Sequence, residues 1–335
     1  MPVGELYALI AAASWAVGSL LFAKIGKRVS PGAMNLGKCI SAAFVLVLAR
    51  AALTPSLGSP AWLPEAAALL AVSGVIGLTI GDTAYFGAIV SIGVPRAILL
   101  LSAAPVFAAI GGVVFLGERV GPREAAGIAL TLAGIALVVT GRARPSQPPA
   151  TALAPSGAAL ASGAPAAPVA SLAPVAALAS LPPIAPATAR RGVALGIVAA
   201  VCQASGSLLA RRAMKLGVDP LAASAARLVT GAVSLIALAL LTGHARRWVR
   251  ELRAGRAWLS VAGASQIGTV GGIWLSQLAI HHCASTGVAT TLLATSPIFA
   301  LPLAHFTGQE RITARAAAGT ALAIAGVVLL SLRPS

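Results

Sequence analysis

The sequence predicts an all-α integral membrane protein with ten transmembrane helices, arranged as two inverted five-helix repeats. Three observations lead to this prediction: an extreme apolar composition, ten apolar runs long enough to cross a bilayer, and a repeat that relates the two halves of the chain. Of 335 residues, 58% are hydrophobic and only 10% are charged, whereas soluble domains carry about 25% charged residues. This composition excludes a water-soluble enzyme and, outside one segment, a disordered chain.

The ten apolar runs have the length that a spanning helix needs, about 20 residues. No basic stretch precedes the first run and nine more follow it, so we interpret it as a retained span and not as a signal peptide. The net charge of +16 comes from basic residues that lie mostly between the runs, where they meet lipid headgroups; this argues against nucleic-acid binding. The predicted spans are residues 5–23, 33–52, 66–89, 95–116, 122–140, 192–210, 221–241, 258–280, 286–306 and 313–332.

A proline-rich segment separates the two halves. Residues 142–190 hold 10 of the 22 prolines and are otherwise rich in Ala and Ser, and proline at this density cannot continue a helix. We predict that this segment is a disordered linker. It divides the chain into a first repeat at 1–141, the linker at 142–190 and a second repeat at 191–335.

The two halves repeat with an offset that changes slightly along the chain. It is 188 residues at Gly18 and Gly206, 189 at the next two matched positions and 192 from Pro105 onward. Because each half holds an odd number of spans, the second half enters the membrane upside down relative to the first, an architecture typical of secondary transporters. The matched pairs include Pro31 with Pro220, Lys38 with Arg227, Pro105 with Pro297, Glu118 with Glu310, Gly127 with Gly319 and Gly134 with Gly326.

Two long motifs carry a family resemblance. They are GDTAYFGAIVSIGVPRAILLLSAAPVFAAIGGVVFLGERVGPREAAGIALTLAGIAL in the first half and GIWLSQLAIHHCASTGVATTLLATSPIFALPLAHFTGQERITARAAAGTALAIAGVVLL in the second. Each has a proline in the fourth helix, a turn with Glu and a glycine-bearing fifth helix; the second copy has Gln309 where the first has Gly117. In these motifs the chain resembles the EamA family of the drug/metabolite transporter superfamily. The resemblance implies ten helices, a central cavity and transport of small metabolites by alternating access.

Asp82 is the one carboxylate of eight that lies well inside an apolar run. A charge at bilayer depth is costly and usually faces a cavity, so we expect a proton-coupling or substrate-cation site. The alternatives are a carboxylate bonded to helix-end amides beside Gly81, or one paired with a basic neighbour. Tyr85 lies three residues on and shares its helical face.

With an offset of 192 residues, the helical face that contains Asp82 matches a row of residues on one helical face in the second half. It matches Asp82 with Trp274, Tyr85 with Gln277 and Ile89 with His281. An aromatic stripe is often simply packed or lipid-facing, but the two matched faces carry the polar residues of their helices. In the first and sixth spans Trp15 matches Gln203 beside the glycines. We therefore predict that the substrate-binding cavity is lined by Trp15, Asp82, Tyr85, Gln203, Trp274 and Gln277.

Lys38 and Arg227 occupy equivalent places in the second and seventh spans. Two matched intramembrane cations indicate anion recognition, or ion pairs that close alternate gates. The alternative is that their long stems carry the charges to the headgroups. We assign Lys38, Arg227 and Asp82 to coupling or gating, and expect Glu118–Arg119 and Glu310–Arg311 to form weak interfacial ion pairs.

The sequence therefore predicts a secondary transporter, an exporter of amino-acid-like or drug-like solutes, in a bacterial plasma (inner) membrane. No catalytic residue, metal site or cofactor is expected. The expected partners are a small-molecule substrate and membrane lipid, with a second copy of the chain as a candidate. Two alternatives stay open: a non-transporting membrane scaffold or receptor, and an enzyme acting on lipid-linked substrates, for which the clustered His, Asp or Glu residues are missing.

Overall fold

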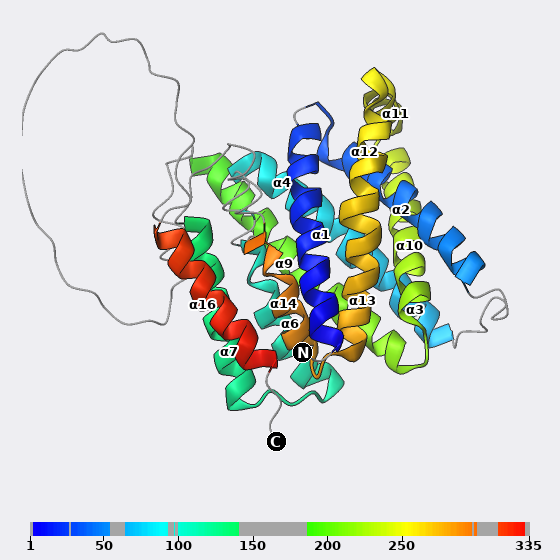
Figure 1. Cartoon of the computed structure of the whole chain (residues 1–335). Coiled ribbons are helices and arrows are strands. Elements are labelled where there is room, and N and C mark those ends of the chain that lie inside the picture. Colours follow the sequence, from blue (N-terminus) through cyan, green and yellow to red (C-terminus); the bar gives the residue numbers. More distant parts are fainter. Residues whose placement is uncertain are drawn as a thin grey trace, which may run out of the picture.

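The computed structural model describes residues 3–26, 28–53, 64–92, 97, 100–140, 186–296, 298–299 and 314–331. All regular elements within these residues are helices, and they overlap each of the ten predicted ranges (Figure 1). Five apolar helical stretches are long enough to cross a bilayer by themselves: Val3–Phe22, Pro31–Leu53, Pro64–Ile92, Ala187–Lys215 and Pro220–Leu241. Residues 142–185 of the predicted linker and the Glu310–Arg311 turn lie outside the described residues.

The first helix, α1, begins at the end of the bundle marked N in Figure 1 and runs away from it. The helices that follow run alternately towards and away from that end. Proline opens several of them, which suits a helix start because its missing N–H would have no partner there. In order they are α1 (Val3–Ile25), α2 (Pro31–Leu53), α3 (Pro64–Ser73), η1 (Gly74–Gly81), α4 (Asp82–Ile92), α6 (Ala104–Leu116) and α7 (Pro122–Thr140).

The second half begins at the opposite end of the bundle (Figure 1). Its first helix starts at Pro186, inside the segment predicted as a linker at 142–190. A proline suits a first helical position, because its missing N–H would have no partner there. The elements are α9 (Pro186–Lys215), α10 (Pro220–Leu241), α11 (Ala245–Arg253), η2 (Ala254–Arg256), α12 (Ala257–Ser265), η3 (Gln266–Gly271), α13 (Gly272–His282), α14 (Thr286–Leu293) and α16 (Ala314–Ser331).

The third span of each half contains a π-helical segment at an equivalent place. η1 joins α3 to α4 and η3 joins α12 to α13, with helical backbone angles at both junctions. π-helical turns inside α-helices are rare and are frequent at functional sites. Their recurrence in both halves agrees with the repeat found in the sequence.

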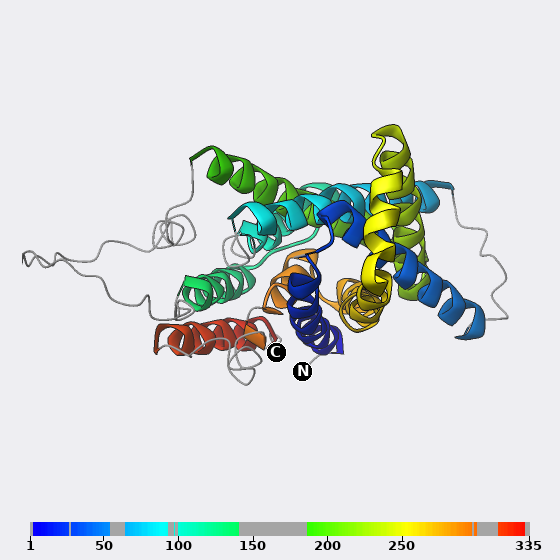
Figure 2. The ribbon, with the colours of Figure 1, turned by 90° about the horizontal axis from the view of Figure 1, so that it is seen from above.

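The halves are interlocked and not side by side. α1 packs on α13 and η3 of the second half, α9 packs on α3, η1, α4 and α6 of the first half, and α7 packs along α16. Figure 2 shows the α7–α16 pair at one edge of the bundle and α11 lying across its end. Neither half therefore buries its own core alone.

Two glycine pairs mark the crossings between the halves. A Cβ on Gly18 of α1 would lie 2.6 Å from the Cα atom of Gly268 in η3, and one on Gly206 of α9 would lie 3.1 Å from the Cα atom of Gly77 in η1. Small residues allow such close approach of helices in membranes. The two crossings are equivalent under the repeat, with the roles of the halves exchanged.

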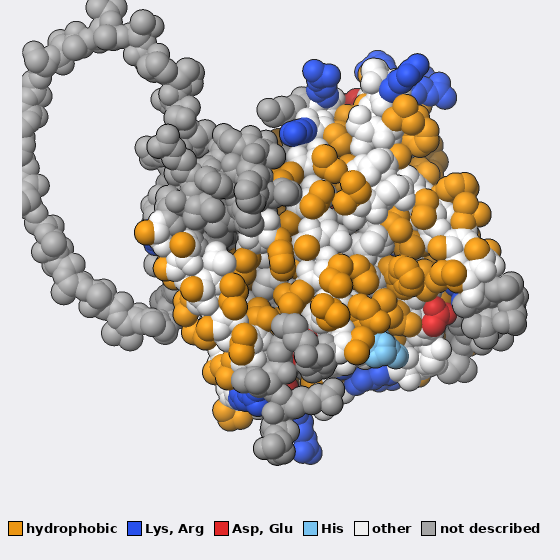
Figure 3. Space-filling model, viewed as in Figure 1, with side chains coloured by type: hydrophobic (Ala, Val, Ile, Leu, Met, Phe, Trp, Pro, Cys, Tyr) orange, Lys and Arg blue, Asp and Glu red, His pale blue; other side chains and the backbone are white. Residues whose placement is uncertain are grey.

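The outer surface suits a bilayer. Hydrophobic side chains cover the middle of the face in Figure 3, while Lys and Arg gather at its two ends. Large apolar side chains point outward, among them Phe44, Val114 and Phe115, which are 65%, 66% and 74% exposed. Since a soluble protein rarely exposes so large an apolar area, the belt marks the chain as a membrane protein.

Candidate functional site: a cavity between the two halves

A cavity of about 340 Å³ lies between the halves and is lined by both of them. Its walls come from α1, α2, η1, α4 and α6 of the first half and from α9, α10, η3, α13 and α14 of the second. The structure brings seven of the eight predicted site residues to this one cavity. They are Trp15, Lys38, Asp82, Tyr85, Gln203, Arg227 and Gln277.

Asp82 forms an ion pair with Lys38 inside the bundle. The carboxylate Oδ2 accepts a hydrogen bond from Nζ of Lys38, and the side chains are 19% and 6% exposed. The Lys38 ammonium also lies 5.5 Å from the ring centroid of Phe86, a cation–π contact. The alternative in which Asp82 pairs with a basic neighbour is therefore the one that the structure shows. The Lys38 side chain is buried inside the protein, so it does not extend to the lipid headgroups.

Arg227 of α10 is as buried as Lys38 but is not paired in the same way. It is 4% exposed, it forms no ion pair within 4 Å among the described residues, and its Nε has no hydrogen-bond partner there. Its Nη2 atom lies beside the second glycine crossing, 3.1 Å from where a Cβ on Gly77 would be and 3.4 Å from one on Gly206. Because these two glycines have no Cβ atom, the guanidinium group of Arg227 fits beside them.

Gln277 of α13 is the most enclosed polar group of the cavity wall. It is 0% exposed, and neither its Oε1 nor its Nε2 atom has a hydrogen-bond partner among the described residues. Buried amides are nearly always hydrogen-bonded, since an unsatisfied group costs about 1–3 kcal/mol. Elsewhere on the cavity wall, the hydroxyl of Ser207 in α9 donates to the backbone carbonyl of Gln203 at 2.9 Å.

Trp274 does not line the cavity; it is partly buried and packs against the hydrophobic core cluster that contains Phe86 and Ile273. His281 of the same predicted stripe is exposed.

The physical reason is a one-residue error in the repeat offset. In the third spans the cavity-facing residues match with an offset of 191, as do the crossing glycines Gly77 and Gly268, whereas the offset of 192 holds only after the next loop. One residue turns an α-helix by about 100°, enough to move a side chain out of the cavity. The cavity-facing pairs are Leu78 with Thr269, Asp82 with Ile273, Tyr85 with Ser276, Phe86 with Gln277 and Ile89 with Ile280.

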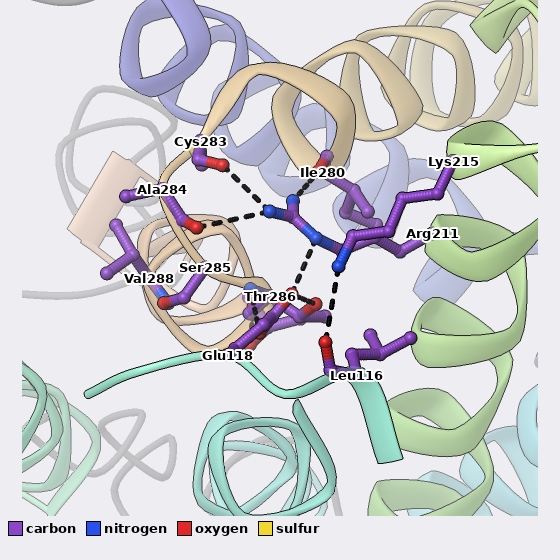
Figure 4. Close-up of polar contacts among 11 residues, drawn as sticks. Leu116, Glu118, Arg211, Lys215, Ile280, Cys283, Ala284, Ser285, Thr286 and Val288 are labelled. Carbon is purple, nitrogen blue, oxygen red and sulfur yellow. Dashed lines mark hydrogen bonds and ion pairs between the residues drawn. The ribbon is translucent and has the colours of Figure 1, made fainter. Parts of the chain in front are cut away.

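A second buried polar cluster lies at the end of the bundle that holds both termini (Figures 1 and 4). Oε1 of Glu118 lies 2.6 Å from Nε of Arg211, with the side chains only 4% and 9% exposed. The carboxylate also accepts hydrogen bonds from the backbone N–H of Thr286 at 2.9 Å and from its hydroxyl at 2.8 Å. The Arg211 Nη atoms donate to the carbonyls of Ile280, Cys283 and Ala284.

This cluster corrects the expected Glu118–Arg119 surface pair. Gly117 ends α6 in the left-handed conformation, with φ of 63°, and folds Glu118 back so that its N–H donates to the carbonyl of Gly112 at 3.0 Å. Arg119 is exposed, and Arg211 reaches Glu118 from the other half of the chain. The signal in the sequence is the glycine, since glycine is the usual residue at a left-handed helix end.

Comparisons with known proteins agree with this architecture. The profile of a family described as the EamA-like transporter family matches residues 2–140 and 190–332. A solved crystal structure is similar in fold, with a TM-score of 0.72 and 18% sequence identity over 98% of this chain and 95% of that chain. No curated protein matches the sequence significantly.

Proposed function

The chain belongs to the EamA-like transporter family, and on this premise we propose that it is a secondary transporter that exports small amino-acid-like or drug-like metabolites. Ten transmembrane helices in two inverted repeats would form it, in the inner membrane of a bacterium. The observation that carries the proposal is the cavity between the halves, with seven predicted polar or aromatic residues on its wall. Its volume of about 340 Å³ lies in the range of small-molecule sites.

The way the halves cross supports alternating access as the mechanism of this proposal. The Gly18–Gly268 and Gly206–Gly77 contacts bring backbone against backbone, so the halves can rock about these crossings without repacking large side chains. Transporters with inverted repeats expose a midplane site to either side by such rocking. The buried Glu118–Arg211 cluster holds α9 to the start of α14 at the end of the bundle where α1 begins, and in this proposal it would open when the cavity opens to that side.

The proposed coupling site is the Asp82–Lys38 ion pair. Its position on the cavity wall places a titratable group where a solute would bind. Protonation of Asp82 would remove the partner of Lys38 and change the net charge of the cavity by one unit. A proton and a solute could thereby control each other's binding, which is the requirement for coupled transport.

The experiment is solute flux in proteoliposomes that contain the purified full-length chain. Liposomes are loaded with a mixture of amino acids, nucleobases and cationic drugs, and release is followed with and without a pH gradient across the membrane. Protein-free liposomes and a Gly206→Leu variant, which blocks a crossing, are the negative controls. The matched control is Gly263→Leu, because no atom lies within 4 Å of a Cβ at Gly263.

Release of one solute class by the wild type and Gly263→Leu, but not by Gly206→Leu, is the expected result. Equal release from protein-free and wild-type liposomes in both directions would contradict the proposal and favour a scaffold. Release that ignores the pH gradient would contradict proton coupling alone.

A further inference from the structure

Lys38 and Arg227 are matched by the repeat, but only Lys38 has a carboxylate at the matched position of its own half. Lys38 has Asp82, and under the offset of 191 found in the third spans the residue equivalent to Asp82 is Ile273, which also lines the cavity. The second half therefore keeps the cation and lacks the carboxylate.

Within the described part of the chain, the charges on the cavity wall do not balance. Lys38, Arg227 and Asp82 all line the cavity, so two cations accompany one carboxylate, and the net charge of the three is +1. A buried uncompensated charge is strongly unfavourable, unless an anion and further hydrogen bonds complete its surroundings. Proteins bury Arg and Lys almost solely when they are paired.

Gln277 provides an independent indication of a bound group. Its amide is fully buried in the wall of the same cavity and has no partner for its donor or its acceptor among the described residues. Arg227 likewise has a buried Nε without a partner there. An arginine fork and an amide N–H together make charge-assisted hydrogen bonds of the kind that a carboxylate accepts.

We propose that Arg227 and Gln277 bind the carboxylate of the transported solute, which supplies the anion that the second half lacks. This inference rests on the proposed function and adds the substrate class: small amphipathic carboxylates, monoanionic or zwitterionic. The apolar part of the solute would pack on the aromatic side chains of the cavity wall, Trp15, Phe22 and Tyr85. Asp82 and Lys38 complete each other and do not take part in holding the carboxylate.

The test is binding by the purified full-length chain to matched acids and amides. The probes are 4-methylpentanoate with 4-methylpentanamide, and 3-phenylpropanoate with 3-phenylpropanamide, titrated calorimetrically at pH 7. Each pair differs only in the group that Arg227 would contact. We expect the acid to bind the wild type about tenfold more tightly than its amide, the scale of one charge-assisted hydrogen bond.

Variants assign this preference to residues. Arg227→Gln should reduce the acid-to-amide ratio to about one, Arg227→Lys should keep part of it, and Gln277→Leu should weaken acid binding several-fold. The matched control is Arg253→Gln, the same substitution at an exposed position of α11 away from the cavity; it should bind like the wild type.

Equal affinity of the wild type for acid and amide would overturn the inference, and this comparison depends on no variant. An undiminished acid preference in folded Arg227→Gln would overturn it as well. Flux of neutral or cationic solutes that Arg227→Gln leaves unchanged would sustain the transporter and refute the carboxylate site. Acid binding that depends on Arg227, in a protein that shows no solute flux, would support the carboxylate site and refute the proposed transport.

Discussion

Glu118 and Arg211 join the two halves of the chain through a buried ion pair, with 2.6 Å between Oε1 and Nε. The geometry at Nε is not that of a hydrogen bond, and the Nη atoms of Arg211 instead donate to carbonyls at the end of α13. Glu118 in turn holds Thr286 at the start of α14. One charge pair thus joins the residues after α6, the helix α9 and the turn between α13 and α14.

Replacing Glu118 with Gln should destabilise the protein strongly. The substitution keeps the shape of the side chain but leaves Arg211 buried without an anion, and breaking a buried pair in this way costs about 3–5 kcal/mol. We expect a loss of about 3 kcal/mol in the free energy of unfolding, measured by denaturant titration in detergent.

The chain provides a matched control one residue away. Arg212 pairs with Glu65 at 3.2 Å, but both side chains are about half exposed, at 52% and 54%. Exposed pairs contribute about 0.2–1 kcal/mol, so Glu65→Gln should lose less than about 1 kcal/mol. Similar losses of unfolding free energy for Glu118→Gln and Glu65→Gln would show that burial does not make the Glu118–Arg211 pair more stabilising than an exposed pair.

Replacing Asp82 with Asn should abolish flux driven by a pH gradient. The variant also leaves Lys38 without its anion, so a loss of flux could reflect unfolding. The double variant Asp82→Asn with Lys38→Gln removes both charges, and we expect it to regain the thermal stability of the wild type in detergent while flux stays absent. Normal pH-driven flux in either folded variant would rule out Asp82 as the coupling group.

Alanine at a crossing glycine should destabilise the protein more where the new Cβ has less space. At Gly18 the new Cβ would lie 2.6 Å from the backbone of Gly268, and at Gly206 it would lie 3.1 Å from that of Gly77. Overpacking costs about 1–3 kcal/mol, so Gly18→Ala should lower the unfolding temperature more than Gly206→Ala. Gly263→Ala has open space and should raise stability by up to about 1 kcal/mol, because alanine is the better helix former. Any other order would contradict the crossing geometry.

Glu251 should make the contact between α11 and α2 sensitive to pH. Partial burial raises the pKa of its carboxylate, but hydrogen bonds from Ser30 and Arg247, at 2.9 and 2.7 Å, outweigh burial, and the pKa lies below its ordinary value of 4.5. A lowered pKa in the folded state means that ionised Glu251 stabilises the protein fully above its ordinary pKa and loses this effect as the pH falls through the lowered value. The difference in unfolding temperature between wild type and Glu251→Gln should therefore be constant from pH 8 to pH 6 and shrink towards pH 3.

The helices were predictable because their signal is local. Apolar runs with prolines at their starts place most of the described helices within a few residues of the predicted ranges. The exceptions are α6, which begins at Ala104, α9, which begins at Pro186, and α14, which ends at Leu293. The short basic helix α11 (Ala245–Arg253) lies between two predicted spans and was not predicted. The π-helical segments were not predictable, because Gly74–Gly81 reads as one more stretch of an apolar run. Both segments pack against the other half, η1 on α9 and η3 on α1, and these contacts between distant parts of the chain leave no local signal.

The candidate site was predictable as far as the repeat register held. Asp82, Lys38 and Arg227 stand out as charges within apolar runs, and the cavity collects them. Trp274 failed because an offset measured in one helix was carried across a loop that differs in length by one residue. The pairing of Asp82 with Lys38, and that of Glu118 with Arg211 across 93 residues of sequence, depend on tertiary packing.

The interlocking of the halves also bears on biosynthesis. When the first five helices leave the ribosome, the partners of Gly77, Glu118 and α7 (Gly206, Arg211 and α16) have not yet been made. The nascent first half therefore waits in the bilayer with the Glu118 side chain unpaired and the glycine face of η1 uncovered. Assembly can be completed only after translation has reached α16, so a ribosome that stalls in the second half would leave a species that membrane quality-control proteases can recognise.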